Sequence, residues 1–252
     1  MPIDPQLKSQ LEVVVRAHFN FAAEILELTQ LSDGSANRGN HFYCTDSQGE
    51  KFGLKLATRL ASGAETEKLL ADVAELLKIA NACSVRQDTR ISLIPQFNGK
   101  KINLTHWLKN SKKVSEMSAA DRTKASTTDA VEFARQLGQW AAFGILFGVD
   151  DRHLGNFVWS PEKGLSMIDL EDAYRTKNWS DYHGVVQFVY ARKLTQNEAR
   201  ALQTGFRFVA SKVLAERSAI TTLLSTQSGG VAHKLDFVYA RSQLKQLLMH
   251  CP

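Results

Sequence analysis

The segment GVDDRHLGNFVWSPEKGLSMIDLED, residues 148–172, restricts the possible folds more than any other part of the chain. Its two short apolar stretches, FVW and LSMI, flank the turn-forming residues SPEKG, a pattern typical of a β-hairpin. Asn156 directly precedes the first stretch and Asp169 directly follows the second. Because the two strands of a hairpin run antiparallel, these side chains should return to the same end of it. The segment therefore predicts a polar site beside a short hairpin.

The residue types at this site indicate its chemistry. An Asn oxygen and an Asp carboxylate close together are hard oxygen ligands, suited to a magnesium ion that also binds phosphate oxygens. Asp151 lies five residues before Asn156 and adds a second carboxylate near the same point. We therefore predict a metal site formed by Asn156 and Asp169.

The order of these residues resembles the catalytic machinery of protein kinases, in which an Asp, an Asn five residues later and a metal-binding Asp follow one another. The Asp-Arg-His order of residues 151–153 is similar to that of phosphoinositide kinases, actin-fragmin kinase and small bacterial effector kinases, where DRH-x-x-N is the catalytic loop. The resemblance implies that Asp151 orients the acceptor hydroxyl and accepts its proton. It implies further that His153 contacts the γ-phosphate, that Arg152 is structural, and that the cofactors are ATP and Mg²⁺ or Mn²⁺.

The resemblance also assigns a lysine upstream. In kinases a Lys on the third strand contacts the α- and β-phosphates of ATP and a helix Glu. The stretch KFGLKLA supplies Lys55, which shares one face of the predicted strand with Gly53, and the resemblance places the adenine ring at Gly53. Ser62 can cap the helix that follows. Three glutamates of this helix are candidate partners of Lys55, and we favour the second of Glu65, Glu67 and Glu75.

Two further segments resemble parts of a nucleotide site. The loop DGSANRGN, residues 33–40, lies between two predicted strands, and its glycines permit close approach of the backbone to phosphate. We expect Gly34, Ser35 and Gly39 to contact the ATP phosphates. The segment ISLIPQF, residues 91–97, resembles a hinge between two lobes, and its Gln96 would lie near the adenine.

The pattern of elements predicts an α+β protein with a two-lobed, protein kinase-like fold. The small β-rich N-lobe would span residues 1–97, and the mainly helical C-lobe would span residues 98–252. Strands are expected at 25–31, across HFYCT and KFGLKLA, and at 91–95, and a loop with some helix is expected at 109–128. Apolar periodicity predicts helices at 7–24, after Ser62, at 129–148, and across about 195–225 and 232–250.

Function is expected to be ATP-dependent phosphate transfer to an alcohol group, and a Ser/Thr protein kinase acting on a protein substrate is favoured. A phosphoinositide kinase, a nucleotide-binding pseudokinase and an AMP transferase on the same fold stay open as alternatives. The metal-binding triplet is Asp169-Leu170-Glu171 where kinases usually have Asp-Phe-Gly, and no Ala-Pro-Glu sequence follows it. The usual switching of that triplet and the usual protein-substrate platform are therefore not expected.

Composition excludes several other classes. The three cysteines form no C-x-x-C pair, and the histidines lack zinc-enzyme spacing, so neither a disulfide framework nor a zinc site is expected. The net charge of +5 suits a polyanionic ligand such as a nucleotide, a phosphoinositide or nucleic acid, but it is too small to indicate any one of them. No nucleic-acid partner is expected. No stretch approaches the roughly 18 apolar residues of a membrane span. We expect a cytoplasmic protein, with export by a bacterial secretion system as the open alternative and no prediction of oligomeric state.

Overall fold

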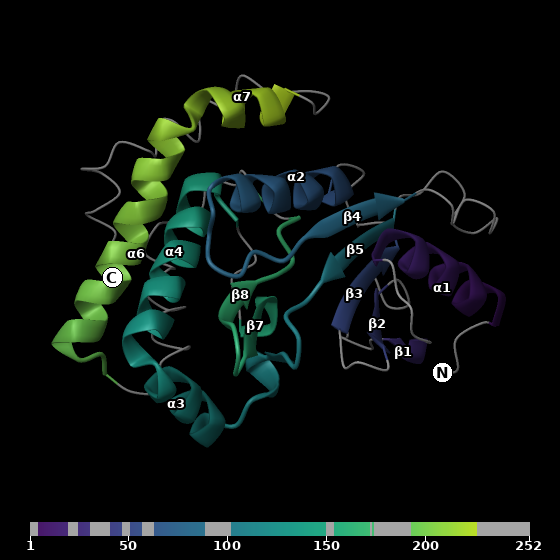
Figure 1. Ribbon diagram of the computed structural model, residues 1–252, viewed down its shortest axis with the longest axis horizontal. Helices are drawn as coiled ribbons and strands as arrows, with labels where there is room; N and C mark the ends of the chain where they lie inside the picture. Colours follow the sequence, from purple (N-terminus) through teal and green to yellow (C-terminus); the bar gives the residue numbers. More distant parts are fainter. Residues whose placement is uncertain are drawn as a thin grey trace.

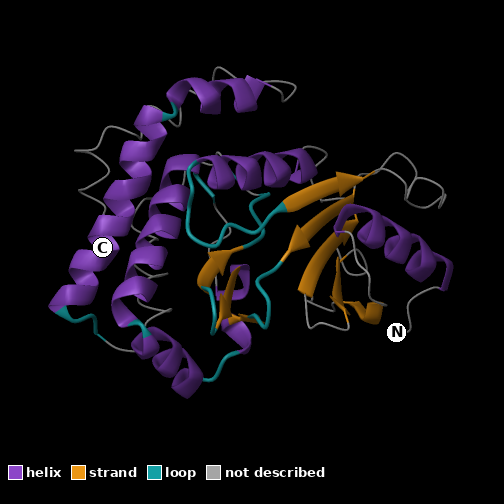
Figure 2. Ribbon diagram, in the orientation of Figure 1, coloured by secondary structure: helices purple, strands orange, loops and turns teal. Residues whose placement is uncertain are grey.

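The computed structural model describes residues 5–19, 25–30, 41–46, 51–56, 63–88, 102–149, 154–171, 173 and 193–225. These residues form a β-rich part and a mainly helical part, with a second, small sheet between them (Figures 1 and 2). The predicted α+β organisation is confirmed.

The β-rich part is a five-stranded antiparallel sheet with the strand order β1-β2-β3-β5-β4. Its strands are β1 Ile25–Gln30, β2 His41–Asp46, β3 Lys51–Leu56, β4 Val85–Asp88 and β5 Ile102–His106. The first three confirm the strands predicted from alternation and turn residues. Two helices accompany this sheet, α1 Pro5–Phe19 and α2 Gly63–Leu76. Residues 20–24, the end of the first predicted helix, lie outside the described residues.

Strand β5 places the end of this sheet later in the chain than residue 97. β5 lies between β3 and β4, and it pairs with β4 from Val85↔Thr105 to Asp88↔Ile102. A boundary at residue 97 would separate two paired strands, so a boundary drawn from the sheet falls after His106. The strand expected at 91–95 lies outside the described residues.

The helical part contains α3 Ala119–Thr128, α4 Ala130–Phe147, α6 Gln196–Ala215 and α7 Arg217–Ser225. The bounds of α4 match the prediction because both ends carry suitable caps. The Asp129 side chain accepts a hydrogen bond from the Glu132 amide, and Gly148 adopts the left-handed conformation with φ 59° that commonly ends a helix. The helix predicted at 232–250 lies outside the described residues.

A three-stranded sheet lies in the middle of the molecule, between α4 and the larger sheet (Figure 1). It consists of β6 Lys112–Lys113, β7 Phe157–Ser160 and β8 Gly164–Met167, and two short 3₁₀ helices adjoin it, η3 Val114–Glu116 and η4 Leu154–Asn156. The segment 109–128 is thus more regular than predicted. Its main helix, α3, begins after Ser118, whose side chain accepts a hydrogen bond from the Asp121 amide.

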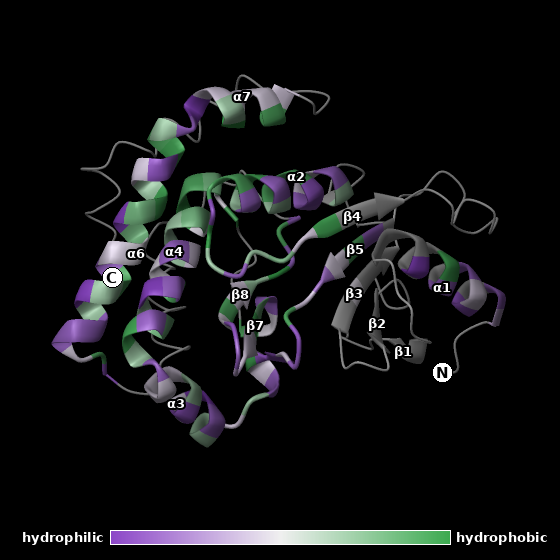
Figure 3. Cartoon of the chain, viewed as in Figure 1, coloured by the Kyte–Doolittle hydropathy of each residue, from purple (hydrophilic) through white to green (hydrophobic). Residues whose placement is uncertain are grey.

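The apolar core joins α2, α4, α6 and α7 to the small sheet, and Figure 3 shows hydrophobic residues concentrated along α2 and α4. Its largest fully buried side chains include Trp140, Phe143, Phe147 and Phe206. Trp140 and Phe143 meet edge to face, with ring centroids 5.7 Å apart. This core fixes the helix that leads into residues 150–153.

Helices α4 and α6 lie side by side (Figure 1), and two glycines allow their backbones to touch. A Cβ atom added to Gly138 would lie 2.0 Å from the Leu202 carbonyl oxygen. One added to Gly205 would lie 2.0 Å from the Arg135 carbonyl oxygen. Only glycine fits at these two positions without separating the helices.

Candidate active site

The hairpin β7–β8 has the antiparallel register that the sequence predicted, from Phe157↔Met167 to Ser160↔Gly164. Beyond its last pair, the Ile168 amide donates a hydrogen bond of 2.8 Å to the Asn156 carbonyl oxygen. Asn156 is buried, and Asp169 directly follows Ile168. The two predicted metal ligands therefore lie at the same end of the hairpin.

Asp169 has an unusual backbone conformation. Its φ angle is 61°, in the left-handed region that residues other than glycine rarely adopt. The apolar neighbours on both sides, Ile168 and Leu170, are buried and hold the backbone in place, whereas Asp169 itself is partly exposed. Strained residues of this kind cluster at functional sites, where the surrounding packing holds them.

Strand register relates Lys55 to helix α2. Lys55 pairs with Asn103 of β5, and directly opposed residues of an antiparallel ladder share a face of the sheet. The Asn103 side chain is fully buried and donates a hydrogen bond of 2.8 Å to Oε2 of Glu67. Glu67 is 1% exposed, whereas Glu75 of the same helix is exposed. Among the three candidate glutamates, this arrangement favours Glu67 as the partner of Lys55.

Trp107 lies where the kinase resemblance places the adenine ring. A Cβ atom on Gly53 would lie 2.8 Å from Nε1 of Trp107, so the indole packs on the Gly53 backbone. Trp107 belongs to a small buried cluster with Cys83, Val158 and Ile168. Sequence analysis missed this residue, and the signal that could have revealed it is an aromatic residue directly after the strand INLTH.

Cys83, the only cysteine whose side chain lies in the described part of the chain, is a free and buried thiol. Burial raises the pKa of its thiol to about 11, although a hydrogen bond with Ser166 partly offsets this effect. The Cys83 Sγ and Ser166 Oγ atoms are 3.3 Å apart. The thiol is neutral at physiological pH, so it is no candidate nucleophile.

Seven predicted site residues lie outside the described residues: Gly34, Ser35, Gly39, Gln96, Asp151, Arg152 and His153. The structure describes the residues on both sides of the segment that contains Asp151, Arg152 and His153. On one side, the Val149 amide donates a hydrogen bond of 2.9 Å to the Gly144 carbonyl oxygen, and Val149 is buried. On the other side, η4 leads directly into β7.

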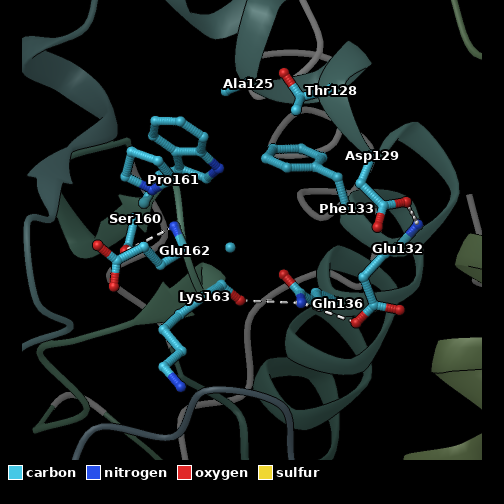
Figure 4. Close-up of a pocket in the computed structure, with 12 residues that line it drawn as sticks. Ala125, Thr128, Asp129, Glu132, Phe133, Gln136, Ser160, Pro161, Glu162 and Lys163 are labelled. Carbon is cyan, nitrogen blue, oxygen red and sulfur yellow. Dashed lines mark hydrogen bonds between the residues drawn. The ribbon is translucent and has the colours of Figure 1, made fainter.

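A separate pocket of about 140 Å³ lies at the turn of the hairpin, against α3 and α4 (Figure 4). Gln136 of α4 connects the two sides: its Oε1 accepts a hydrogen bond of 2.8 Å from the Leu165 amide, and its Nε2 donates to Glu132 and to the Lys163 carbonyl oxygen. The hydrogen bond from Arg135 lowers the pKa of Glu132. These contacts fasten the hairpin to α4 at the end away from Asn156 and Asp169.

The described residues offer neither a metal-binding cluster of acidic, histidine or cysteine side chains nor a membrane-spanning helix. Among the described residues, no group of three His, Cys, Asp or Glu side chains could hold a metal ion. The predicted metal pair consists of one carboxylate and one amide, and Asp151 lies outside the described residues. Within the same part of the chain, no helix has the length and apolarity needed to cross a membrane.

Comparison with known proteins bears on the fold. No protein-family model matches the chain, and no curated protein matches it. A crystal structure of a Helicobacter pylori proinflammatory kinase, CtkA, is similar, with a TM-score of 0.50 and 11% sequence identity over 91% of this chain and 95% of that chain. At this identity the similarity concerns the fold alone. The chain has the α+β, protein kinase-like fold that its sequence predicted.

Proposed function

We propose that the chain is an ATP-dependent phosphotransferase that transfers the γ-phosphate of ATP to an alcohol group. One observation carries this proposal: the hairpin brings Asn156 and Asp169 together at one end, and Asp169 has a left-handed backbone there. An amide oxygen and a carboxylate so arranged suit Mg²⁺ or Mn²⁺ bound to phosphate. The kinase-like fold supports the same function.

The proposed roles follow from position and charge. Asn156 and Asp169 would hold the metal ion, and Lys55 would contact the α- and β-phosphates. The backbone of Gly34, Ser35 and Gly39 would contact the phosphates, and Gln96 would lie near the adenine. Such a site accelerates phosphate transfer mainly by positioning the reactants and stabilising charge.

In the proposed reaction the acceptor oxygen forms a bond to the γ-phosphorus. The bond between that phosphorus and the β,γ-bridging oxygen breaks, and ADP leaves with the electron pair. Asp151 orients the hydroxyl and takes its proton, while His153 contacts the γ-phosphate and Arg152 supports the loop. The residues on either side of this loop, Val149 and Leu154, are held by α4 and by η4.

We further propose that the acceptor is a Ser or Thr hydroxyl of a protein. The Asp-Arg-His order of residues 151–153 resembles that of small bacterial effector kinases, which phosphorylate Ser or Thr in proteins, and a solved structure with a similar fold is that of a bacterial kinase. The modest charge of +5 also gives little attraction to an anionic membrane. A phosphoinositide kinase is the second candidate for the same site.

Labelled ATP provides the test. The purified protein is incubated with γ-labelled ATP and Mg²⁺ or Mn²⁺, with a cell lysate in one reaction and phosphoinositide vesicles in another. We expect label on Ser or Thr of protein in the wild type and none with Asp169→Ala. Label in lipid alone would contradict the protein acceptor. Label from α-labelled ATP without γ-label would indicate AMP transfer, and nucleotide binding without any transfer would indicate a pseudokinase.

A further inference from the structure

Asn103 makes two contacts that fasten helix α2 to the five-stranded sheet. Its side-chain amide donates one hydrogen bond of 3.0 Å to the Ala64 carbonyl oxygen and one of 2.8 Å to Oε2 of Glu67. Ala64 lies in the first turn of α2, and Glu67 lies three residues later. Both contacts join residues far apart in the sequence. A single buried strand residue therefore sets the position and the rotation of the start of the helix.

The buried environment of Glu67 requires that its carboxylate be accurately positioned. Burying a carboxylate costs free energy unless hydrogen bonds or a positive charge compensate for the lost hydration. Glu67 is 1% exposed, and Asn103 donates to one of its two carboxylate oxygens. The backbone position of Lys55 lies directly opposite Asn103 in the ladder. The Glu67 carboxylate is thus held beside the strand position that carries Lys55.

We propose that Asn103 is a positioning residue that orients the Glu67 carboxylate toward Lys55, an inference that rests on the proposed phosphotransferase function. Asn103 does not touch ATP in this proposal. It acts through Glu67, which in turn places the Lys55 ammonium group on the phosphates. Because the contact comes from the sheet itself, the sheet holds the start of α2 in its working position.

A double-mutant cycle tests this proposal. Asn103→Leu removes both hydrogen bonds at similar side-chain volume, and Glu67→Gln removes the charge that Asn103 orients. We expect Asn103→Leu to lower kcat/KM for ATP by about tenfold to 100-fold, as expected when a phosphate-binding group is misplaced. In the Glu67→Gln background the same substitution should change kcat/KM less than twofold, although it should still lower the melting temperature through the lost bond to Ala64.

Asn81→Asp is the matched control. The Asn81 amide also donates two hydrogen bonds to backbone carbonyl oxygens, those of Lys163 and Leu165, but it lies away from Glu67. This variant should lower the melting temperature and leave kcat/KM within about twofold of the wild-type value. If Asn103→Leu does not fold, Asn103→Thr, whose hydroxyl can donate one hydrogen bond, enters the same cycle.

The outcomes separate this inference from the function on which it rests. An active wild-type enzyme in which the effects of Asn103 and Glu67 substitutions on kcat/KM simply multiply would overturn the positioning role alone. A wild-type protein that transfers no phosphate would overturn the proposed function, and the positioning role with it. Loss of activity in Glu67→Gln with no further loss on changing Asn103 would support both.

Discussion

Replacing Gly205 by Ala should destabilise the protein, although alanine normally stabilises a helix. The interior of α6 would gain about 1 kcal/mol from the higher helix propensity of alanine. Against this gain, the new Cβ atom would lie 2.0 Å from the Arg135 carbonyl oxygen, and contacts under 3.0 Å are essentially never seen. To reach a contact of 3.0 Å, the two backbones would have to separate by about 1 Å. Overpacking of this depth costs about 3 kcal/mol, so the net loss is about 2 kcal/mol.

Thermal unfolding measures this loss. A domain of this size loses about 2–4 °C in Tm per kcal/mol, so we expect Gly205→Ala to lower Tm by about 4–8 °C. Gln203→Ala, on the exposed face of the same helix, is the control and should change stability by about 0.5 kcal/mol or less.

Gly138→Ala should behave like Gly205→Ala, because its Cβ atom would lie 2.0 Å from the Leu202 carbonyl oxygen. The double variant should lose less than the sum of the two, since one separation of the helices relieves both contacts. A higher Tm for Gly205→Ala, or strict additivity in the double variant, would refute the reasoning.

Three other predictions concern the site. Asp169→Ala should abolish metal-dependent ATP binding, whereas Asp151→Ala should keep ATP binding and lose turnover. Calorimetry measures the binding, and transfer of the γ-phosphate measures the turnover. Full activity in Asp151→Ala would assign the role of accepting the hydroxyl proton to Asp150. Trp107→Ala should lower Tm and tighten ATP binding because the indole packs on Gly53, and weaker binding would show that the ring supports the nucleotide instead. The pKa of about 11 keeps the Cys83 thiol neutral up to high pH. Mass spectrometry should therefore find Cys83 unalkylated in the native protein at pH 8 and alkylated after unfolding.

The sequence predicted the hairpin and α4 because their signals are local. SPEKG separates two short apolar stretches, and Asp129 and Gly148 are strong helix caps. Strand β5 was not predicted because two of its residues, Asn103 and Thr105, are polar although they are buried. In the sequence alone, polar residues at these positions indicate a solvent-exposed segment. Their burial depends on β3 and β4 pairing on either side, and on α2, which the local sequence does not specify.

The missed strand explains the other differences. Without β5, the boundary of the β-rich part was placed at residue 97, before a strand that pairs inside its sheet. For the same reason Trp107 was overlooked. The contact with Asn103 of β5 adds long-range support for Glu67, the glutamate that the sequence already favoured. Long-range pairing, which has no local signal, was the missing information for the boundary and for Trp107.

The same strand also connects the two halves of the candidate site. Asn103, which contacts Glu67, and Trp107 are four residues apart across the end of β5. Trp107 packs in one buried cluster with Ile168, the residue directly before Asp169, and with Val158 of the hairpin. The segment from Asn103 to Trp107 thus contacts Glu67 at one end and packs beside the hairpin at the other. Because Trp107 also packs on Gly53 of β3, two residues before Lys55, this one side chain lies against both the strand that carries Lys55 and the hairpin that leads to Asp169.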